Sequence, residues 1–239
     1  MTEQLQSDFD KIIKTSDFSE KEIQSKKSFL NKFIESGFPN RKQEDWKFLD
    51  ISQIIKKNIG ELSFFNDNSL PNKIDPSIFV DGLEHNKIIF INGRIEKIDF
   101  NYEDKDKIEI SDEIEKKISF DYKNSLIDLN RALTNKVFKI SVKKNYSLKK
   151  PLIIYHSTND KISKKNVNLR LDFELEENSS LKLIDYFSKS VDKNFINILY
   201  NFNLKNYSIL KNYKIDKFKN NNVKYSFNNI EQNSNSVSE

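Results

Sequence analysis

The first forty residues carry apolar side chains at the spacing of amphipathic helices. The first predicted helix has an apolar stripe along one face, formed by Leu5, Phe9, Ile12 and Ile13. A second helix is predicted to begin after Ser19, because Ser19 and Glu22 have the spacing of a capping box. Gly37 is expected to end this helix in a left-handed conformation, and Pro39 prevents its continuation.

The middle of the chain is predicted to hold a β-hairpin and a further helix. Asn92-Gly93 separates the apolar runs 87–91 and 94–98, and this dipeptide favours a type I′ turn, in which both central residues have positive φ. Leucines that share one helical face predict the helix over residues 124–133.

From about Val137 onward, apolar and polar residues alternate with a period of two, which is typical of β-strands. The most regular run covers residues 167–175. No helical pattern interrupts the series. The predicted strands are 137–142, 151–155, 167–175, 181–187, 195–202, 207–215 and 223–227.

The turns between these strands share one form: asparagine, any residue, serine and an aliphatic residue. The form begins at Asn145, Asn178 and Asn206, roughly 30 residues apart, with about three short strands in each unit. Such a recurrence indicates stacked β-coils, because each coil leaves backbone groups that only the next coil can pair. An antiparallel sandwich or meander with coincidental turn sequences is the alternative.

Composition narrows the classes of function. The 239 residues are 36% hydrophobic and 32% charged, which fits an elongated shape, and the absence of cysteine excludes disulfides and thiolate ligation of iron or zinc. The net charge of +4 is spread among acids, without the basic stripe of a nucleic-acid-binding protein. Because the sequence has neither a signal peptide nor an apolar run of about 18 residues, the cytoplasm is the expected compartment.

Few residues have the arrangement of a reactive site. His85 and His156 are isolated, and His156 is expected at the surface, where a strand ends. Asp172, Glu174 and Glu176 alternate on one strand face and could serve a β-helix carbohydrate enzyme. A solvated outer face is the simpler interpretation of these three acids.

The most distinctive cluster surrounds the only tryptophan. Trp46 and Phe48 are expected to anchor the N-terminal helices, and Lys47 could lay its stem on the indole. Arg41 and Glu44 would pair if this segment were helical. If Trp46 is buried, its replacement by alanine should cost about 3–5 kcal/mol.

Five segments, in order along the chain, resemble the SufB/SufD family of iron–sulfur cluster assembly scaffolds. Residues 38–48 (FPNRKQEDWKF) are similar to the (L/F)-P-(T/N)-R-(K/R)-x-E-x-W-(K/R)-(Y/F) segment near the start of these proteins. The other segments are the hairpin FINGR (90–94), the helix LNRAL (129–133), the pair VFKISV (137–142) and LKKPL (148–152), and the turn LEENSS (175–180).

The resemblance implies an α+β chain with a right-handed parallel β-helix. Residues 1–59 would form a helical region, and residues 60–122 would form a connecting region that contains the hairpin. Residues 123–239 would form the start of an incomplete β-helix core. The missing cysteines favour the SufD type, a non-catalytic scaffold that works with a SufB-like subunit and a SufC-like ATPase, and with neither nucleic acid nor membrane. The resemblance implies no cofactor or metal bound by this chain alone, and a nascent iron–sulfur cluster only within the complex. The residues that carry the family motif, with an expected structural role, are Arg41, Glu44, Trp46, Lys47, Asn92 and Gly93.

Family members are substantially longer, so the sequence is expected to be a fragment or a shortened form. An uncapped solenoid end would aggregate or pair with another chain. Two other classes stay open: a β-helix lyase or hydrolase, and a β-rich interaction module.

Overall fold

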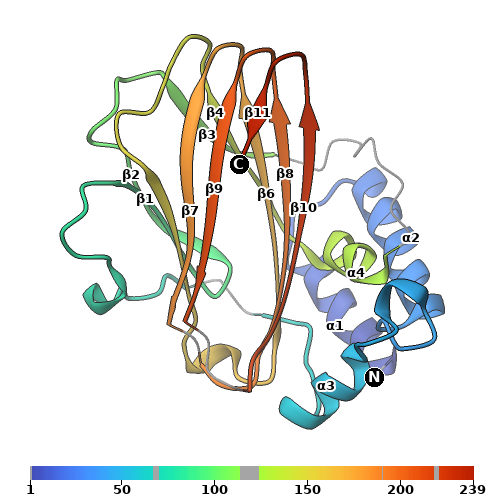
Figure 1. Cartoon of the computed structure of the whole chain (residues 1–239). Coiled ribbons are helices and arrows are strands. Elements are labelled where there is room, and N and C mark those ends of the chain that lie inside the picture. Colours follow the sequence, from blue (N-terminus) through green and yellow to red (C-terminus); the bar gives the residue numbers. More distant parts are fainter. Residues whose placement is uncertain (1, 67–69, 114–123, 190, 218–220) are drawn as a thin grey trace.

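A layer of helices packs beside stacked parallel β-strands in the computed structural model, which describes residues 2–66, 70–113, 124–189, 191–217 and 221–239 (Figure 1). The helices are α1 (Thr2–Lys14), α2 (Glu20–Ser36), α3 (Ile51–Asn58) and α4 (Ser125–Leu133), with the single 3₁₀ turns η1 (Glu44–Trp46), η2 (Pro76–Ile78) and η3 (Asp160–Ile162). The predicted helical segment followed by a parallel β-helix is therefore confirmed.

Helix α2 begins and ends near the predicted residues. The Ser19 backbone N–H donates to Glu22 Oε2 (2.8 Å), and Ser19 Oγ accepts from the Glu22 backbone N–H, which confirms the capping box. Gly37 ends the helix with φ 66° and ψ −169° rather than in the expected left-handed helical region. This conformation is open almost only to glycine, so the residue type was correct and its conformation was not.

The helices share one apolar core with the outer face of a sheet. Leu5, Phe9, Leu30 and Phe33 are buried there, as the stripe on α1 and the apolar face of α2 predict. Helix α4 packs most closely against α2, and Phe195 of the sheet is buried in the same cluster. The helical layer therefore covers one face of the strands (Figure 1).

The predicted hairpin is present and belongs to the solenoid. Strands β1 (Asn86–Ile91) and β2 (Arg94–Asp99) pair antiparallel, and Asn92 and Gly93 have φ of 55° and 82°, as a type I′ turn requires. Strand β1 also pairs parallel with β5 (Leu152–Ser157), so the hairpin starts one of the two sheets.

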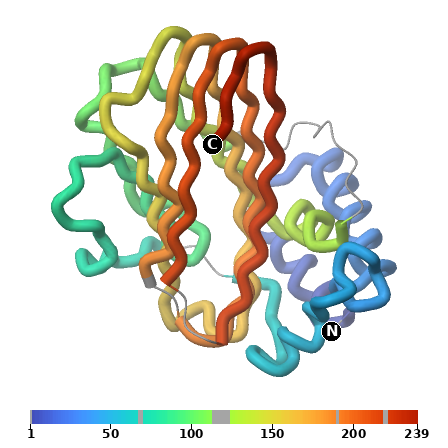
Figure 2. Tube along the Cα trace, in the orientation of Figure 1, coloured from blue at the N-terminus to red at the C-terminus, as the bar shows by residue number. Residues whose placement is uncertain are grey.

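The remaining strands belong to two sheets, and from β4 onward they alternate between them along the chain (Figure 2). The strands are β3 (Ile108–Glu113), β4 (Val137–Val142), β6 (Asn166–Leu175), β7 (Ser180–Lys189), β8 (Phe195–Leu204), β9 (Ile209–Asp216), β10 (Val223–Gln232) and β11 (Val237–Ser238). One sheet has the order β11-β9-β7-β5-β1-β2 and the other β10-β8-β6-β4-β3, with parallel pairing from β4 to β11. Parallel pairing excludes the antiparallel sandwich.

Two features of the coils differ from the sequence prediction. Each coil contributes two long strands, one to each sheet, instead of three short ones. Strand β3, which pairs antiparallel with β4, was not predicted, because its apolar alternation is too short to stand out.

The repeated turn forms a stack of left-handed residues at one end of the coils. Asn145, Asn178, Tyr207 and Asn235 all have φ near +60° (55° to 61°), and Asn178 Nδ2 donates to Asn145 Oδ1 (3.0 Å). Ser180 pairs with Ile209, so the third occurrence of the form is shifted by one residue relative to the second. Tyr207, and not the asparagine before it, occupies the left-handed position.

The inner faces of the two sheets form an apolar lumen. Alternate residues of β6 and β8 point inward and are almost fully buried, as the period-two pattern predicts. The inward residues of β6 are Leu169, Leu171, Phe173 and Leu175. Polar side chains at inward positions of the later strands are therefore exceptions that need partners.

Candidate functional site

The tryptophan of the family-like segment lies at the edge of the helical layer. Trp46 is half-buried, and its ring lies 6.0 Å from the ring of Tyr225 on β10. Phe48 is 85% exposed. Trp46 therefore joins the loop to the solenoid, whereas Phe48 contributes little to this contact.

The charged residues of this segment pair differently from the prediction. Glu44 forms its ion pair with Lys47 (3.1 Å), because η1 places these two side chains three residues apart on one turn, while Arg41 lies in the preceding turn. The Lys47 ammonium lies over the ring of Phe48, 5.3 Å from its centroid, and not over the indole of Trp46 as expected. These charged side chains are not brought together with Asn92 and Gly93, which form the hairpin turn.

A residue of the family-like LNRAL segment binds the helical layer to both coils beneath it. Asn130 is fully buried, and its Nδ2 donates to the backbone oxygens of Leu169 (3.1 Å) and Asn197 (2.8 Å). In return, Asn197 Nδ2 donates to Leu126 O (2.8 Å). This role was missed, although an asparagine inside an apolar helical pattern is a signal that it has buried partners.

The predicted acidic ladder, which has Asp172 and Glu174 on β6 and Glu176 just after it, is paired with basic residues. The ion pairs are Asp172–Arg170 (3.2 Å), Glu174–Lys139 (2.7 Å) and Glu176–Lys143 (3.4 Å). The Lys139 ammonium is the main cause that lowers the pKa of Glu174. Lys139 lies on the neighbouring strand β4 and Lys143 directly follows that strand. The ladder therefore serves pairing between adjacent coils, as expected for a charged outer face.

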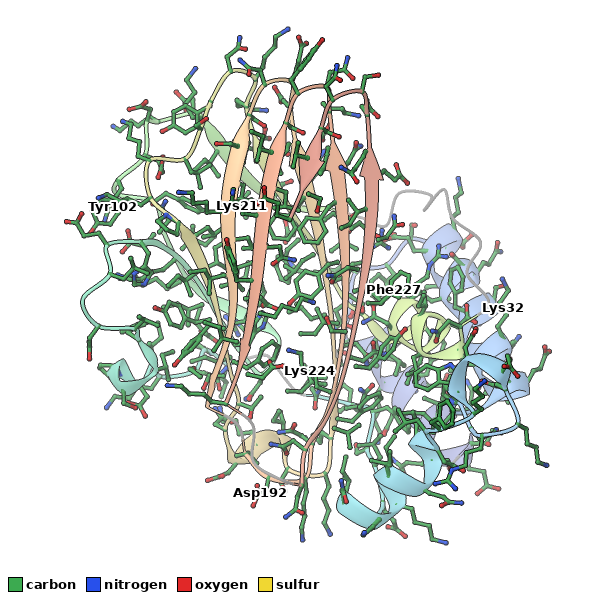
Figure 3. The ribbon with its side chains drawn as sticks, in the orientation of Figure 1. Lys32, Tyr102, Asp192, Lys211, Lys224 and Phe227 are labelled. Carbon is green, nitrogen blue, oxygen red and sulfur yellow. The ribbon has the colours of Figure 1, made fainter. Side chains whose placement is uncertain are left out.

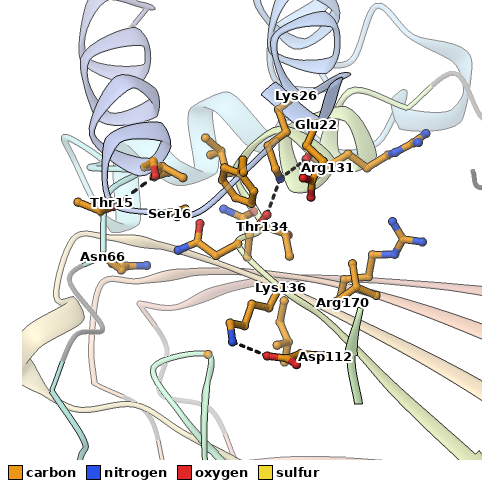
Figure 4. A pocket seen from close by; sticks show the side chains of 18 of the residues that line it. Thr15, Ser16, Glu22, Lys26, Asn66, Asp112, Arg131, Thr134, Lys136 and Arg170 are labelled. Carbon is orange, nitrogen blue, oxygen red and sulfur yellow. Dashed lines mark hydrogen bonds and ion pairs between the residues drawn. The ribbon is translucent and has the colours of Figure 1, made fainter. Parts of the chain in front are cut away.

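A groove of about 1470 Å³ lies between the helical layer and the sheet (Figure 4). On one side, Lys26 is buried and its ammonium donates to Thr134 O (2.6 Å) and Arg131 O (3.3 Å), so it neutralises the C-terminal end of α4. On the other side, Lys136 pairs with Asp112. These charges therefore already have partners within the chain.

A polar cluster lies inside the solenoid. His156 on β5, Asp185 on β7 and Tyr200 on β8 point into the lumen and are at most 5% exposed. His156 Nε2 lies 2.7 Å from Asp185 Oδ1, and the Tyr200 hydroxyl donates to Asp185 Oδ2 (2.6 Å). The prediction that His156 lies at the surface is wrong, because the strand continues past it and pairs with β7.

Stacked aromatic rings enclose the imidazole. Phe90, His156 and Phe187 occupy successive partner positions on β1, β5 and β7. The imidazole lies 5.5 Å from the Phe90 ring at 11° and 4.3 Å from the Phe187 ring at 10°. The ammonium of Lys224, labelled in Figure 3, lies 3.6 Å from the centroid of Phe187. The rings restrict access of water to the His156–Asp185 contact.

The electrostatics of the cluster favour an ionised carboxylate. Burial raises the pKa of Asp185, but His156, the Tyr200 hydroxyl and Lys224 together outweigh it and hold this pKa below its usual value. Burial, followed by the charge of Asp185, raises the pKa of Tyr200 well above its usual value. Tyr200 therefore acts as a hydrogen-bond donor to a carboxylate.

The second histidine lies on the other side of the same sheet. His85 is 4% exposed, its Nδ1 lies 2.6 Å from Leu83 O and its Nε2 lies 2.7 Å from the Tyr155 hydroxyl. Burial is the main cause that lowers the pKa of His85. His85 therefore precedes the hairpin, as expected, but its side chain is buried. The structure does not bring the two histidines together.

A signal for the luminal cluster is present in the sequence. In β7, Asp185 interrupts the inward series Leu181, Leu183 and Phe187, and a carboxylate at such a position requires a buried partner. The partners themselves could not be read from the sequence, because they depend on how the coils are aligned.

No group of three or more histidine, aspartate or glutamate side chains in the described ranges is arranged to hold a metal ion. Among the helices described, none is long and apolar enough to cross a bilayer. Comparisons with protein-family models and with curated proteins found no match to this chain.

Proposed function

We propose that the chain is a non-catalytic scaffold subunit of the SufD type, which acts in the cytoplasm with a SufB-like subunit and a SufC-like ATPase in iron–sulfur cluster assembly. The observation that supports this proposal best is the place of the five family-like segments in the fold. Each segment lies where the chain changes direction or where two layers meet, so the resemblance covers the residues that determine this architecture.

Three of the five segments build the first coil and its attachment. The LNRAL segment is α4, which carries Asn130 onto β6 and β8. Residues 137–142 and 148–152 are β4 and the approach to β5, and residues 175–180 form the next coil corner. Residues 38–48 connect the helical layer to β10 through Trp46.

The arrangement of charged groups also favours a scaffold over a carbohydrate enzyme. Each acid of the β6 ladder is paired with a cation, and Asp185 is enclosed in the lumen. A glycosidase needs two carboxyl groups that flank an accessible sugar, with room between them for chemistry. The chain contains no cysteine, so we place the thiolate ligands of a nascent cluster on the partner subunits.

The proposal is tested by affinity purification of the protein, tagged at its own gene in its source organism. We expect mass spectrometry to identify the SufB-like and SufC-like proteins of that organism, at levels well above those from an untagged strain. The reciprocal purification on a tagged SufC-like protein should recover this chain. The scaffold assignment would be contradicted if the purification on this chain recovered neither partner and the reciprocal purification did not recover this chain. Turnover of polygalacturonate by the pure protein would favour the carbohydrate enzyme.

A further inference from the structure

Residues 72–85, called the strap below, cover the outer face of the sheet that contains β1, β5 and β7 (Figure 1). Ile78 of the strap is buried there in one apolar cluster with Ile89, Ile153 and Tyr155. This cluster lies on the opposite side of the strands from the luminal core. The strap can therefore leave the sheet without opening the lumen.

Hydrogen bonds near the end of the strap determine which nitrogen of His85 carries the proton. The Leu83 backbone oxygen can only accept, so the Nδ1 atom that lies 2.6 Å from it must be the N–H. The Val80 backbone N–H donates to the Tyr155 hydroxyl oxygen (3.1 Å). The hydroxyl proton of Tyr155 is then available to Nε2 of His85, 2.7 Å away, which accepts it.

A second proton on the imidazole does not fit this arrangement. With Nε2 protonated, the Tyr155 oxygen would face two donors, His85 and the Val80 N–H, and its own proton would lose its acceptor. Tyr155 is fully buried, so water does not replace that acceptor. The geometry thus fits the neutral ring with its proton on Nδ1.

Charged and titratable groups face His85 from every neighbouring element. They are Lys87 on β1, Asp99 on β2, Tyr155 on β5 with Tyr186 of β7 behind it, and Asp81 and Glu84 of the strap, of which Glu84 pairs with Lys150. The charge of Lys87 opposes a proton on the imidazole, and that of Asp99 favours it. Asp99 also pairs with Lys97 (3.7 Å), so these charges largely offset one another, and burial and the hydrogen bonds favour the neutral ring.

We propose that the strap is held on the sheet by the neutral form of His85 and is released when this imidazole takes up a proton. In the unfolded chain a histidine has a pKa of about 6.5. The closed strap excludes the proton, so below this pH the open state binds more protons and closure weakens; above it, the full stability of the closed state is present. Release uncovers Ile89, Ile153 and Tyr155, which form an apolar face.

Hydrogen exchange of the full chain, followed by NMR, measures opening of the strap. The amides of Ile78, Phe79 and Val80 are hydrogen-bonded in the closed state. Corrected for the intrinsic pH dependence of exchange, their protection should fall about tenfold from pH 7.5 to pH 5.5, the limit for a histidine that stays neutral while the strap is closed. Amides of α2 and α4 in the same sample are the reference and should change much less.

Two variants separate His85 from a general effect of acid. In His85→Gln, the side-chain oxygen can accept from the Tyr155 hydroxyl but takes up no proton in this range, so the fall should disappear. His156→Gln is the matched control, because it removes the other of the two histidines and leaves the strap unchanged. Its strap should lose protection as in the wild type, relative to α2 and α4 of the same variant.

Nitrogen-15 NMR of the wild-type imidazoles tests the protonation state without any substitution. At pH 7, Nδ1 of His85 should carry the proton and Nε2 should have the chemical shift of an unprotonated nitrogen. A doubly protonated ring, or a proton on Nε2 alone, would contradict the proposal. So would a wild-type strap whose protection does not fall relative to α2 and α4, or an equal fall in His85→Gln.

Discussion

The ionisation of single side chains in this protein is decided by residues about one coil away in sequence. Asp185 is fully buried, but it accepts hydrogen bonds from His156 and Tyr200, which belong to the coils on either side. A buried charge is tolerated only when it has such partners. The triad is therefore a contact between coils as much as a polar site.

We expect Asp185→Ala to lower the free energy of unfolding by about 3–5 kcal/mol, because it leaves two buried donors without an acceptor. Because the folded-state pKa of Asp185 is lowered, its contribution is present above the unfolded value and disappears as pH falls through the folded value. The difference from wild type should thus shrink below about pH 4. Urea denaturation of both proteins at several pH values measures this difference in the free energy of unfolding.

A matched control is Glu109→Ala, which removes an exposed carboxylate paired with Lys143. Exposed ion pairs contribute little to stability, so this variant should unfold like the wild type. An equal effect of the two substitutions would show that Asp185 is not in the enclosed setting described above.

The left-handed turn position is a second feature at the scale of single residues. Tyr207 has φ of 60°, where most side chains are disfavoured, while Asn145, Asn178 and Asn235 hold the matching positions of the other coils. We expect Tyr207→Asn to stabilise the protein by about 1 kcal/mol, because asparagine tolerates this conformation. The change should appear as a higher midpoint of thermal unfolding.

Tyr213→Asn is the companion variant. Tyr213 is exposed like Tyr207, but it lies within β9, whereas Tyr207 lies in the turn before that strand. Asparagine is disfavoured in strands, so this substitution should be neutral or destabilising. If both substitutions stabilised equally, loss of surface apolar area would explain the result better than backbone conformation.

At the scale of elements, the loop between α2 and α3 joins the helical layer to β10. Trp46 makes this connection through Tyr225, and it is only half-buried. We expect Trp46→Ala to cost roughly 1–2 kcal/mol, less than the value for a buried tryptophan. Chemical denaturation followed by circular dichroism measures the loss.

Phe48→Ala, in the same loop, should leave the midpoint of denaturation unchanged, because this ring is 85% exposed. A loss for Phe48→Ala as large as that for Trp46→Ala would mean that the loop packs through its outward aromatic residue instead.

At the scale of the whole molecule, the helical layer and the solenoid share buried polar contacts. Asn130 of α4 donates to backbone oxygens of both β6 and β8, and Thr134 donates to Asn130 Oδ1 (2.9 Å). The two bonds to the strands join segments far apart in sequence. The two layers are therefore expected to unfold together.

We expect Asn130→Ala to lower the free energy of unfolding by about 2–4 kcal/mol, because buried carbonyl oxygens lose their donor. Differential scanning calorimetry should show a lower midpoint and, if the layers separate, two transitions. Asn135→Ala, at an exposed position just beyond α4, should stay within about 0.5 kcal/mol of wild type.

Local rules in the sequence determined the elements of this protein. The capping box at Ser19 begins α2, Asn92-Gly93 turns the hairpin, and the alternation through residues 167–175 decides which side chains of β6 point inward. The spacing of the turns indicated stacked coils, because neighbouring backbone ladders must be paired. These signals act over a few residues, which is why the sequence alone suffices for them.

Only the tertiary structure decided the register between coils, and register decides which side chains meet. A shift of one residue placed Tyr207 rather than Asn206 in the left-handed position. The same alignment placed His156 and Asp185 together in the lumen. Residues about one coil apart become neighbours only when parallel strands pair, and the free energy of that pairing is spread over the whole stack.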